Sequence, residues 1–144
     1  MKLSTRTTYT MLAILELAEH FGKGPLQTKV IAKHQDIPVK YLEQLMVILK
    51  SAGLIKSLRG SKGGYILAQP PEMIKLSEVF DVLEGPVITV ECIMNESSCA
   101  RAADCMARPI WSQVHWAVTN ILRSMTLQDA LDKAKKGQET DYQI

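Results

Sequence analysis

Residues 28–68 read TKVIAKHQDIPVKYLEQLMVILKSAGLIKSLRGSKGGYILA and carry two helix patterns followed by a hairpin pattern. A short helix is expected over 28–35, and Pro38 suits the first position of a longer helix that Gly53 ends. The buried face of this longer helix is expected to consist of Val39, Leu42, Leu45, Met46 and Leu49. Two short apolar runs flank residues 59–64, where three of six residues are glycine, and this pattern predicts a β-hairpin.

The order helix, helix, hairpin predicts a winged helix-turn-helix, in which the second helix enters the major groove of DNA. On that helix Gln44 can pair with adenine and Glu43 can accept a hydrogen bond from cytosine, while Arg59 at the hairpin tip suits a narrow minor groove. The candidate DNA contacts are Lys40, Tyr41, Glu43, Gln44, Arg59 and Lys62. Each residue alone fits a solvated surface better than a DNA contact, but their order within one basic half of the chain favours DNA binding.

Further helices are expected on both sides of this unit. One runs from about Ser4 to Phe21, and a short one from Glu78 to Glu84 is expected to be capped by Ser77. A long helix begins near Pro109 with apolar residues at alternating spacings of three and four, which is typical of a paired helix. Its candidate dimerisation residues are Trp111, Val114, Val118, Ile121 and Met125.

The chain therefore divides into five predicted regions. Residues 1–69 form the DNA-binding domain, 70–86 a linker with a short relay helix, and 87–107 a cysteine loop. Residues 108–136 hold the dimerisation helix and a last helix opened by a capping box of Thr126 and Asp129, and 137–144 form a flexible tail. The fold class is mainly α with a small β-hairpin wing.

The charge of the chain is unevenly distributed. The 144 residues carry a net charge of +2, but residues 1–69 hold ten Lys and Arg against four Asp and Glu, while 70–144 hold seven against eleven. A cationic half is expected of a phosphate-binding module, although solvated surface charge is an alternative. No apolar run reaches the roughly 18 residues of a membrane span, and the N-terminus lacks a secretory pattern, so a cytoplasmic protein without membrane contact is expected.

All three cysteines, Cys92, Cys99 and Cys105, lie in one irregular and largely polar stretch. An odd number of cysteines argues against a disulfide framework, and polar neighbours argue against a core role. Three thiolates suit zinc or an iron-sulfur cluster, with reactive or inert thiols as the alternative. His20 and His34 are expected to be surface residues without partners, and His115 and Trp116 to be packing residues.

The chain resembles the IscR/NsrR/RirA-type iron-sulfur transcriptional regulators over roughly residues 1–125. The similar strings are Met1-Lys2-Leu3-Ser4-Thr5 with Tyr9, Tyr41-Leu42-Glu43-Gln44-Leu45, Gly53-Leu54-Ile55, Arg59-Gly60 and Gly63-Gly64-Tyr65. The resemblance implies that Glu43 and Gln44 read bases, that Arg59 enters the minor groove, and that the long helix forms a homodimer on a pseudo-palindromic operator. It also implies that the three cysteines hold a 2Fe-2S or 4Fe-4S cluster rather than zinc.

The chain departs from this family pattern at the fourth cluster ligand. The IscR branch has a histidine three residues after its third cysteine, where this chain has Arg108, and an NsrR-like branch uses an acidic residue where this chain has Thr8. The remaining candidates are solvent, a small thiol, Glu91, Glu96, Asp104 and His115.

A sensor of iron, nitric oxide or redox state that changes its operator affinity is therefore the leading prediction. The alternatives are a cluster-free regulator that senses a metabolite or thiol oxidation and, more remotely, an iron-sulfur electron carrier. The sequence carries no phosphate-binding loop before a helix and no nucleophile elbow, so no enzymatic activity is expected.

Overall fold

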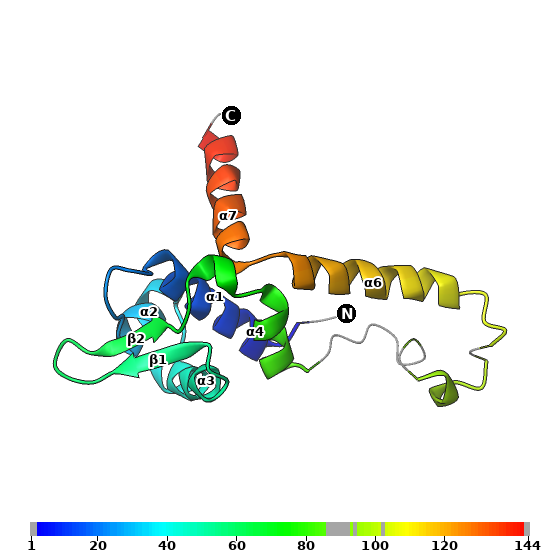
Figure 1. The fold of residues 1–144 in the computed structure, drawn as a ribbon, viewed down its shortest axis with the longest axis horizontal. Helices are drawn as coiled ribbons and strands as arrows, with labels where there is room; N and C mark the ends of the chain where they lie inside the picture. Colours follow the sequence, from blue (N-terminus) through cyan, green and yellow to red (C-terminus); the bar gives the residue numbers. More distant parts are fainter. Residues whose placement is uncertain (1–2, 86–92, 94, 102, 143–144) are drawn as a thin grey trace.

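The computed structural model describes residues 3–85, 93, 95–101 and 103–142 of the chain. Figure 1 shows a helical body with a β-hairpin at one edge and a long helix that extends away from the body. A last helix begins where the long helix meets the body and runs across its direction. The predicted fold class, mainly helical with one small hairpin, is confirmed.

The described residues form six α-helices: α1 Thr5–Glu19, α2 Thr28–Gln35, α3 Val39–Ser51, α4 Leu76–Leu83, α6 Arg108–Ser124 and α7 Leu127–Tyr142. They also form strands β1 Ile55–Leu58 and β2 Gly64–Leu67, and the 3-10 helices η1 Pro71–Met73 and η2 Glu96–Ser98. The strands are antiparallel, with Ile55 opposite Leu67 and Leu58 opposite Gly64. The helix expected over 28–35, the longer helix expected before Gly53, and the hairpin that follows them are confirmed.

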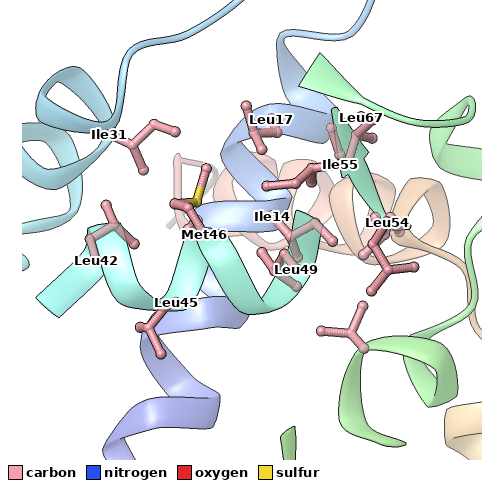
Figure 2. Packing of buried hydrophobic residues seen from close by; sticks show 14 of the residues in the cluster. Ile14, Leu17, Ile31, Leu42, Leu45, Met46, Leu49, Leu54, Ile55 and Leu67 are labelled. Atoms are coloured by element: carbon pink, nitrogen blue, oxygen red, sulfur yellow. The ribbon is translucent and has the colours of Figure 1, made fainter. Parts of the chain in front are cut away.

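The core lies where α1, α2, α3 and the hairpin meet. Helix α3 packs against α1, α2 and β1, and its residues Leu42, Leu45, Met46 and Leu49 are buried. Figure 2 shows Met46 and Leu49 near Ile14 of α1, and Leu42 on the side of Ile31 of α2. Because these four α3 residues repeat at helical spacing, they place one face of α3 in the core and leave the opposite face in solvent. Core packing therefore determines which residues of α3 are presented outward.

The hairpin is joined to the body by a third extended segment before α2. Leu26 donates from its backbone N–H to the carbonyl of Tyr65 (2.9 Å) and accepts from the N–H of Tyr65 (2.8 Å). Gly64 fits beside this segment because it has no side chain: a Cβ there would lie 2.4 Å from the carbonyl oxygen of Leu26. The glycine pattern thus allows the wing to lie against the segment that leads into α2.

Helices α4, α6 and α7 connect through backbone hydrogen bonds near the base of α6. The N–H of Leu76 donates to the carbonyl of Met125 (2.9 Å), and the N–H of Leu127 donates to the carbonyl of Ile74 (2.9 Å). The predicted capping box opens α7: the N–H of Thr126 donates to Asp129, and the N–H of Asp129 donates to the Thr126 hydroxyl. These hydrogen bonds hold the pKa of Asp129 below its usual value.

Several helix ends differ from the sequence-based expectation. Helix α1 ends at Glu19 rather than Phe21, and Pro38 is the residue before α3 rather than its first residue. Helix α4 begins at Leu76 after Lys75, so Ser77 is not its cap; the carboxylate of Glu78 accepts a hydrogen bond from the Lys75 N–H instead. A helix start depends on which residue satisfies the free backbone N–H groups, and here a side chain three residues later does so.

The C-terminal region also differs from its prediction. Helix α7 continues to Tyr142, whereas the sequence predicts an end near Lys136 and a flexible tail over 137–144. Gly137 lies within this helix instead of ending it. Glycine lowers helix stability by roughly 1 kcal/mol relative to alanine, which is too little to end a helix when its neighbours favour one.

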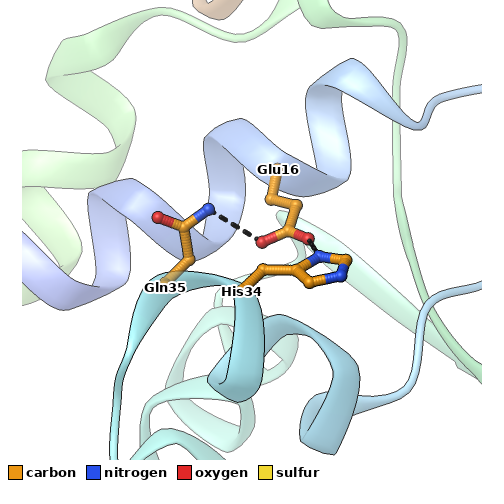
Figure 3. A network of polar contacts seen from close by, with 3 residues as sticks. All are labelled: Glu16, His34 and Gln35. Atoms are coloured by element: carbon orange, nitrogen blue, oxygen red, sulfur yellow. Dashed lines mark hydrogen bonds and ion pairs between the residues drawn. The ribbon is translucent and has the colours of Figure 1, made fainter.

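A polar network joins α1 to α2 near the end of α2 (Figure 3). The carboxylate of Glu16 contacts the Nδ1 atom of His34 and accepts a hydrogen bond from the side-chain amide of Gln35 (2.9 Å). His34 is exposed, as expected, but it has a partner that the sequence pattern did not indicate. Because Glu16 is largely buried, these contacts satisfy its oxygen atoms and fix the angle between the two helices.

Candidate nucleic-acid interface and thiol segment

The outward face of α3 carries most of the predicted DNA-contacting residues. Lys40, Glu43 and Gln44 are all exposed, within about one turn of each other, in the first half of the helix. Val39 and Val47 are also exposed on this face, at 41% and 57% of their surface. The prediction that Val39 lies in the core is wrong: the buried stripe begins at Leu42, and Val39 at the first helical position precedes the packed region.

Tyr41 is held against the body of the protein rather than projecting freely. It is half-buried, and its ring meets the ring of Tyr9 edge to face, with 5.9 Å between ring centres. This contact connects the start of α3 to α1. An aromatic pair of this kind adds about 0.5 to 1.5 kcal/mol beyond area burial. Tyr41 therefore helps to position α3, and only part of its side chain is exposed.

The wing places its two cations at an exposed tip. Arg59 and Lys62 are exposed in the turn between β1 and β2. Gly60, between them, has a φ of 114°, which favours glycine. Gly63 is buried under the turn, and a Cβ there would lie 2.2 Å from the carbonyl oxygen of Leu58. The glycines thus allow a narrow turn, and both cations remain exposed to solvent.

The cysteine segment lies between the end of α4 and the start of α6. Cys92 is outside the described residues, as is Glu91. Cys99 is exposed directly after η2, and Cys105 is partly buried shortly before α6; both are free thiols. Within the described residues, no three His, Cys, Asp or Glu side chains are grouped closely enough to hold a metal ion.

Cys105 lines a hollow of about 460 Å³ together with Arg108, Ser112 and Trp116. Thiol and thiolate are the soft donors that zinc and iron-sulfur clusters bind, so the donor chemistry of the segment fits such a group. Among the candidate fourth ligands with described side chains, Asp104 is exposed beside Cys105. Thr8, on α1, is exposed and donates its hydroxyl to the carbonyl of Ser4.

His115 is the buried residue of α6, at 4% exposure, on a helix that otherwise faces solvent or is half-buried. Its ring meets that of Trp116 edge to face, with 5.0 Å between ring centres. Its Nδ1 atom has no hydrogen-bond partner among the described residues. The packing role expected of His115 agrees with this burial, whereas Trp116 is half exposed.

One side of α6 is apolar and uncovered along most of its length. The predicted dimerisation residues Trp111, Val114 and Ile121 are each more than 40% exposed, and Val118 is half-buried. Met125 follows the end of α6 in extended backbone. Figure 1 shows that the far part of α6 has no neighbouring helix. None of the described helices is long and apolar enough to cross a bilayer.

A carboxylate fastens the end of α4 to the start of α1. Glu84 accepts hydrogen bonds from the hydroxyls of Ser4 and Thr7, each at 2.5 Å, although the residues are about 80 positions apart. These two hydrogen bonds hold the pKa of Glu84 below its usual value of 4.5, and Arg6 adds a smaller effect in the same direction. In the sequence, Glu84 comes shortly before the cysteine segment.

Replacing Glu84 with glutamine is expected to reduce the change in the free energy of unfolding between neutral and acid pH. The folded pKa is lowered, so the ionised carboxylate stabilises the fold above the unfolded value of 4.5, and this contribution is lost as pH falls below 4.5. Urea unfolding from pH 7 to pH 3 should show Glu84→Gln less stable than wild type at neutral pH, with the difference shrinking in acid. In a Thr7→Val background the same substitution should have a smaller effect; an undiminished effect would refute the contact.

Two helices followed by a hairpin with a basic tip, with a polar face on the second helix, define a winged helix-turn-helix DNA-binding protein. Residues 3–133 match the Rrf2 family, described as iron-dependent transcriptional regulators, and the chain belongs to this family. The resemblance predicted from the sequence is thereby confirmed. The protein is a transcriptional regulator that binds DNA.

Relatives of known name extend over nearly the whole chain. The HTH-type transcriptional regulator CymR of Bacillus subtilis is 39% identical over 129 residues, 90% of this chain and 88% of the relative. The structure of CymR, the global cysteine regulator of B. subtilis, matches with a TM-score of 0.80 and 37% identity, covering 92% of this chain and 98% of that one.

Structures from two further sources match comparably. IscR of T. potens matches with a TM-score of 0.76 and 38% identity, covering 96% of this chain and 91% of that one. The oxidized form of Staphylococcus aureus CymR matches with a TM-score of 0.71 and 35% identity, covering 90% and 95%. Among these solved structures the chain is similar to CymR and to IscR to nearly the same degree. In sequence, IscR of Xenorhabdus nematophila is 31% identical over 129 residues, 90% of this chain and 78% of the relative, which is lower than the identity to CymR of B. subtilis.

Proposed function

We propose that the protein is a homodimeric, cytoplasmic sensor that binds a pseudo-palindromic operator and changes its operator affinity with the state of an iron-sulfur cluster at Cys92, Cys99 and Cys105. The observation that supports DNA reading most directly is the exposed face of α3 with Lys40, Glu43 and Gln44, which a wing with exposed Arg59 and Lys62 follows in the chain. The support for a cluster is the occurrence of all three cysteines within residues 92–105 of the sequence, together with similarity to IscR. When bound, the cluster supplies iron that reacts with nitric oxide or oxygen.

The uncovered face of α6 supports pairing with a second copy of the chain. Exposed Trp111, Val114 and Ile121 on one helix face form the apolar seam expected of paired helices. A dimer also matches the two-fold symmetry of a pseudo-palindromic site, with half-sites about one or more helical turns apart.

Val114→Glu would place two carboxylates in that seam, and sedimentation analysis should show monomers. A stable dimer of this variant would refute this interface.

The two wing cations are expected to act differently on DNA. Arg59→Ala should weaken operator binding about tenfold by removing a minor-groove contact, with a larger loss on A·T-rich flanks. Lys62→Ala should weaken binding to all duplexes alike and reduce the slope of log affinity against log salt by about one. Fluorescence anisotropy with duplexes at several salt concentrations measures both. Equal behaviour of the two variants on every duplex would contradict the assignment of Arg59 to the minor groove.

The cluster is tested by purification without oxygen, with measurement of the absorption spectrum and of iron and sulfide content. Wild type should be coloured and contain iron and sulfide, and Cys92→Ala, Cys99→Ala and Cys105→Ala should each lose the colour. Ser98→Ala, an exposed hydroxyl beside Cys99, is the matched control and should keep it. Operator affinity before and after cluster removal then tests sensing, because equal affinities would refute it.

A second candidate is a cluster-free regulator that senses thiol oxidation. The observation that favours it is the exposed thiol of Cys99 and the open hollow beside Cys105, together with similarity to a CymR structure in an oxidized form. On this alternative, colourless and iron-free protein would bind the operator and change affinity on mild oxidation. The response would be lost in Cys99→Ser or Cys105→Ser.

A further inference from the structure

An exposed valine stands at the start of the recognition helix, among residues that face DNA. Val39 is the first residue of α3, is 41% exposed, and lies outside the core cluster, whose first α3 residue is Leu42. Val39 and Glu43 are four residues apart, so they lie on one stripe of the helix, about 6 Å apart along its axis. Val47 continues the same stripe about 12 Å beyond Val39.

The charge of Glu43 indicates which part of DNA this stripe faces. A carboxylate against phosphates is unfavourable, whereas a carboxylate against base edges can accept hydrogen bonds from amino groups. Glu43 therefore favours an orientation in which its stripe faces the floor of the major groove, while Lys40 lies toward the backbone. Val39, one turn earlier on the stripe, then faces base edges as well.

The edges of the bases in the major groove offer one apolar group, the C5-methyl of thymine. When a valine side chain packs against this methyl group, both lose contact with water. Burial of each methyl-sized group stabilises the complex by about 0.8 kcal/mol, which corresponds to about fourfold in affinity. Contact with any other edge would bury polar base atoms against a hydrocarbon without a hydrogen bond, which is unfavourable.

We propose that Val39 is a specificity-determining residue that selects thymine through its C5-methyl group, one turn before the base read by Glu43. This inference rests on the proposed reading of DNA by α3. Val47 does not take part, because the N-terminal residues of a recognition helix reach the base edges and Val47 lies two turns later.

The test compares thymine with uracil, which lacks only the methyl group. A binding duplex is first enriched by the wild-type protein from a random duplex library, and each thymine is then replaced singly by uracil. At one position in each half-site the wild type should lose about fourfold in affinity. Val39→Ser should bind the thymine and uracil duplexes equally, and should bind the uracil duplex as well as the wild type does.

Val47→Ser is the matched control, on the same helix and the same stripe. Serine and valine have similar helix propensities, so neither substitution should destabilise α3. Val47→Ser should keep the full thymine preference. The proposal is overturned if no uracil substitution weakens wild-type binding, or if Val39→Ser keeps the preference.

A separate measurement distinguishes failure of this proposal from failure of the proposed function. If Glu43→Ala changes which duplexes are enriched while the uracil substitutions have no effect, α3 reads DNA and only the role of Val39 is wrong. If the wild type enriches no sequence at all, DNA reading by α3 fails, and the role of Val39 fails with it.

Discussion

Replacing Leu49 with alanine is expected to lower the free energy of unfolding by about 2 to 5 kcal/mol. The Leu49 side chain is 0% exposed in the core, where α3 packs against α1, α2 and β1. The substitution removes three methyl-sized groups and leaves a cavity that the surrounding helices can fill only partly. Because the same packing orients the outward face of α3, operator affinity should fall together with stability.

Urea unfolding followed by circular dichroism measures this loss. Val47→Ala is the matched control, since it truncates an apolar residue of the same helix that is 57% exposed. Its free energy of unfolding should change by less than about 0.5 kcal/mol. Equal losses in the two variants would mean that the packing face of α3 is assigned incorrectly.

Gly64→Ala is expected to lower the free energy of unfolding by about 2 to 5 kcal/mol and to displace the wing. The new Cβ would lie 2.4 Å from the Leu26 carbonyl oxygen, at a backbone φ of 154°. Backbone atoms cannot rotate away as a side chain does, so the segments must separate. Both hydrogen bonds between Leu26 and Tyr65 would lengthen, and the wing would lose its attachment to the segment before α2.

Gly137→Ala provides the control for this substitution. Gly137 lies within α7, and a Cβ there would meet no atom within 4 Å. Alanine in a helix is more stable than glycine by about 0.5 to 1 kcal/mol, so this variant should unfold at higher urea concentration. Operator affinity should fall for Gly64→Ala alone; unchanged affinity would contradict a wing role in binding DNA.

Local patterns predicted the DNA-binding half because its elements are specified by residues close in sequence. The apolar spacing of α3 and the glycines of the wing each determine an element without reference to distant residues. The capping box of Thr126 and Asp129 was predicted for the same reason. Val39 was misassigned because helical spacing alone does not reveal where along a helix the packed region begins.

The contacts missing from the sequence-based prediction join residues far apart in the chain. Leu26 pairs with Tyr65, and Glu84 accepts hydrogen bonds from Ser4 and Thr7, and neither pairing has a local pattern. The exposed residues of α3 could be chosen by type and spacing, so the candidate DNA face was largely accessible to sequence. The cysteine segment was noticed through residue type, and its ligand role stays a prediction.

The length of α6 gives small movements at its base a large effect at its tip. With 17 residues and a rise of about 1.5 Å per residue, the helix is about 25 Å long. It is attached to the body at one end and carries the cysteine segment at the other. On a lever of that length, a tilt of about 10° at the attached end displaces the free end by about 4 Å. Conversely, a shift of that size at the free end, carried along a straight α6, turns its attached end by about 10°.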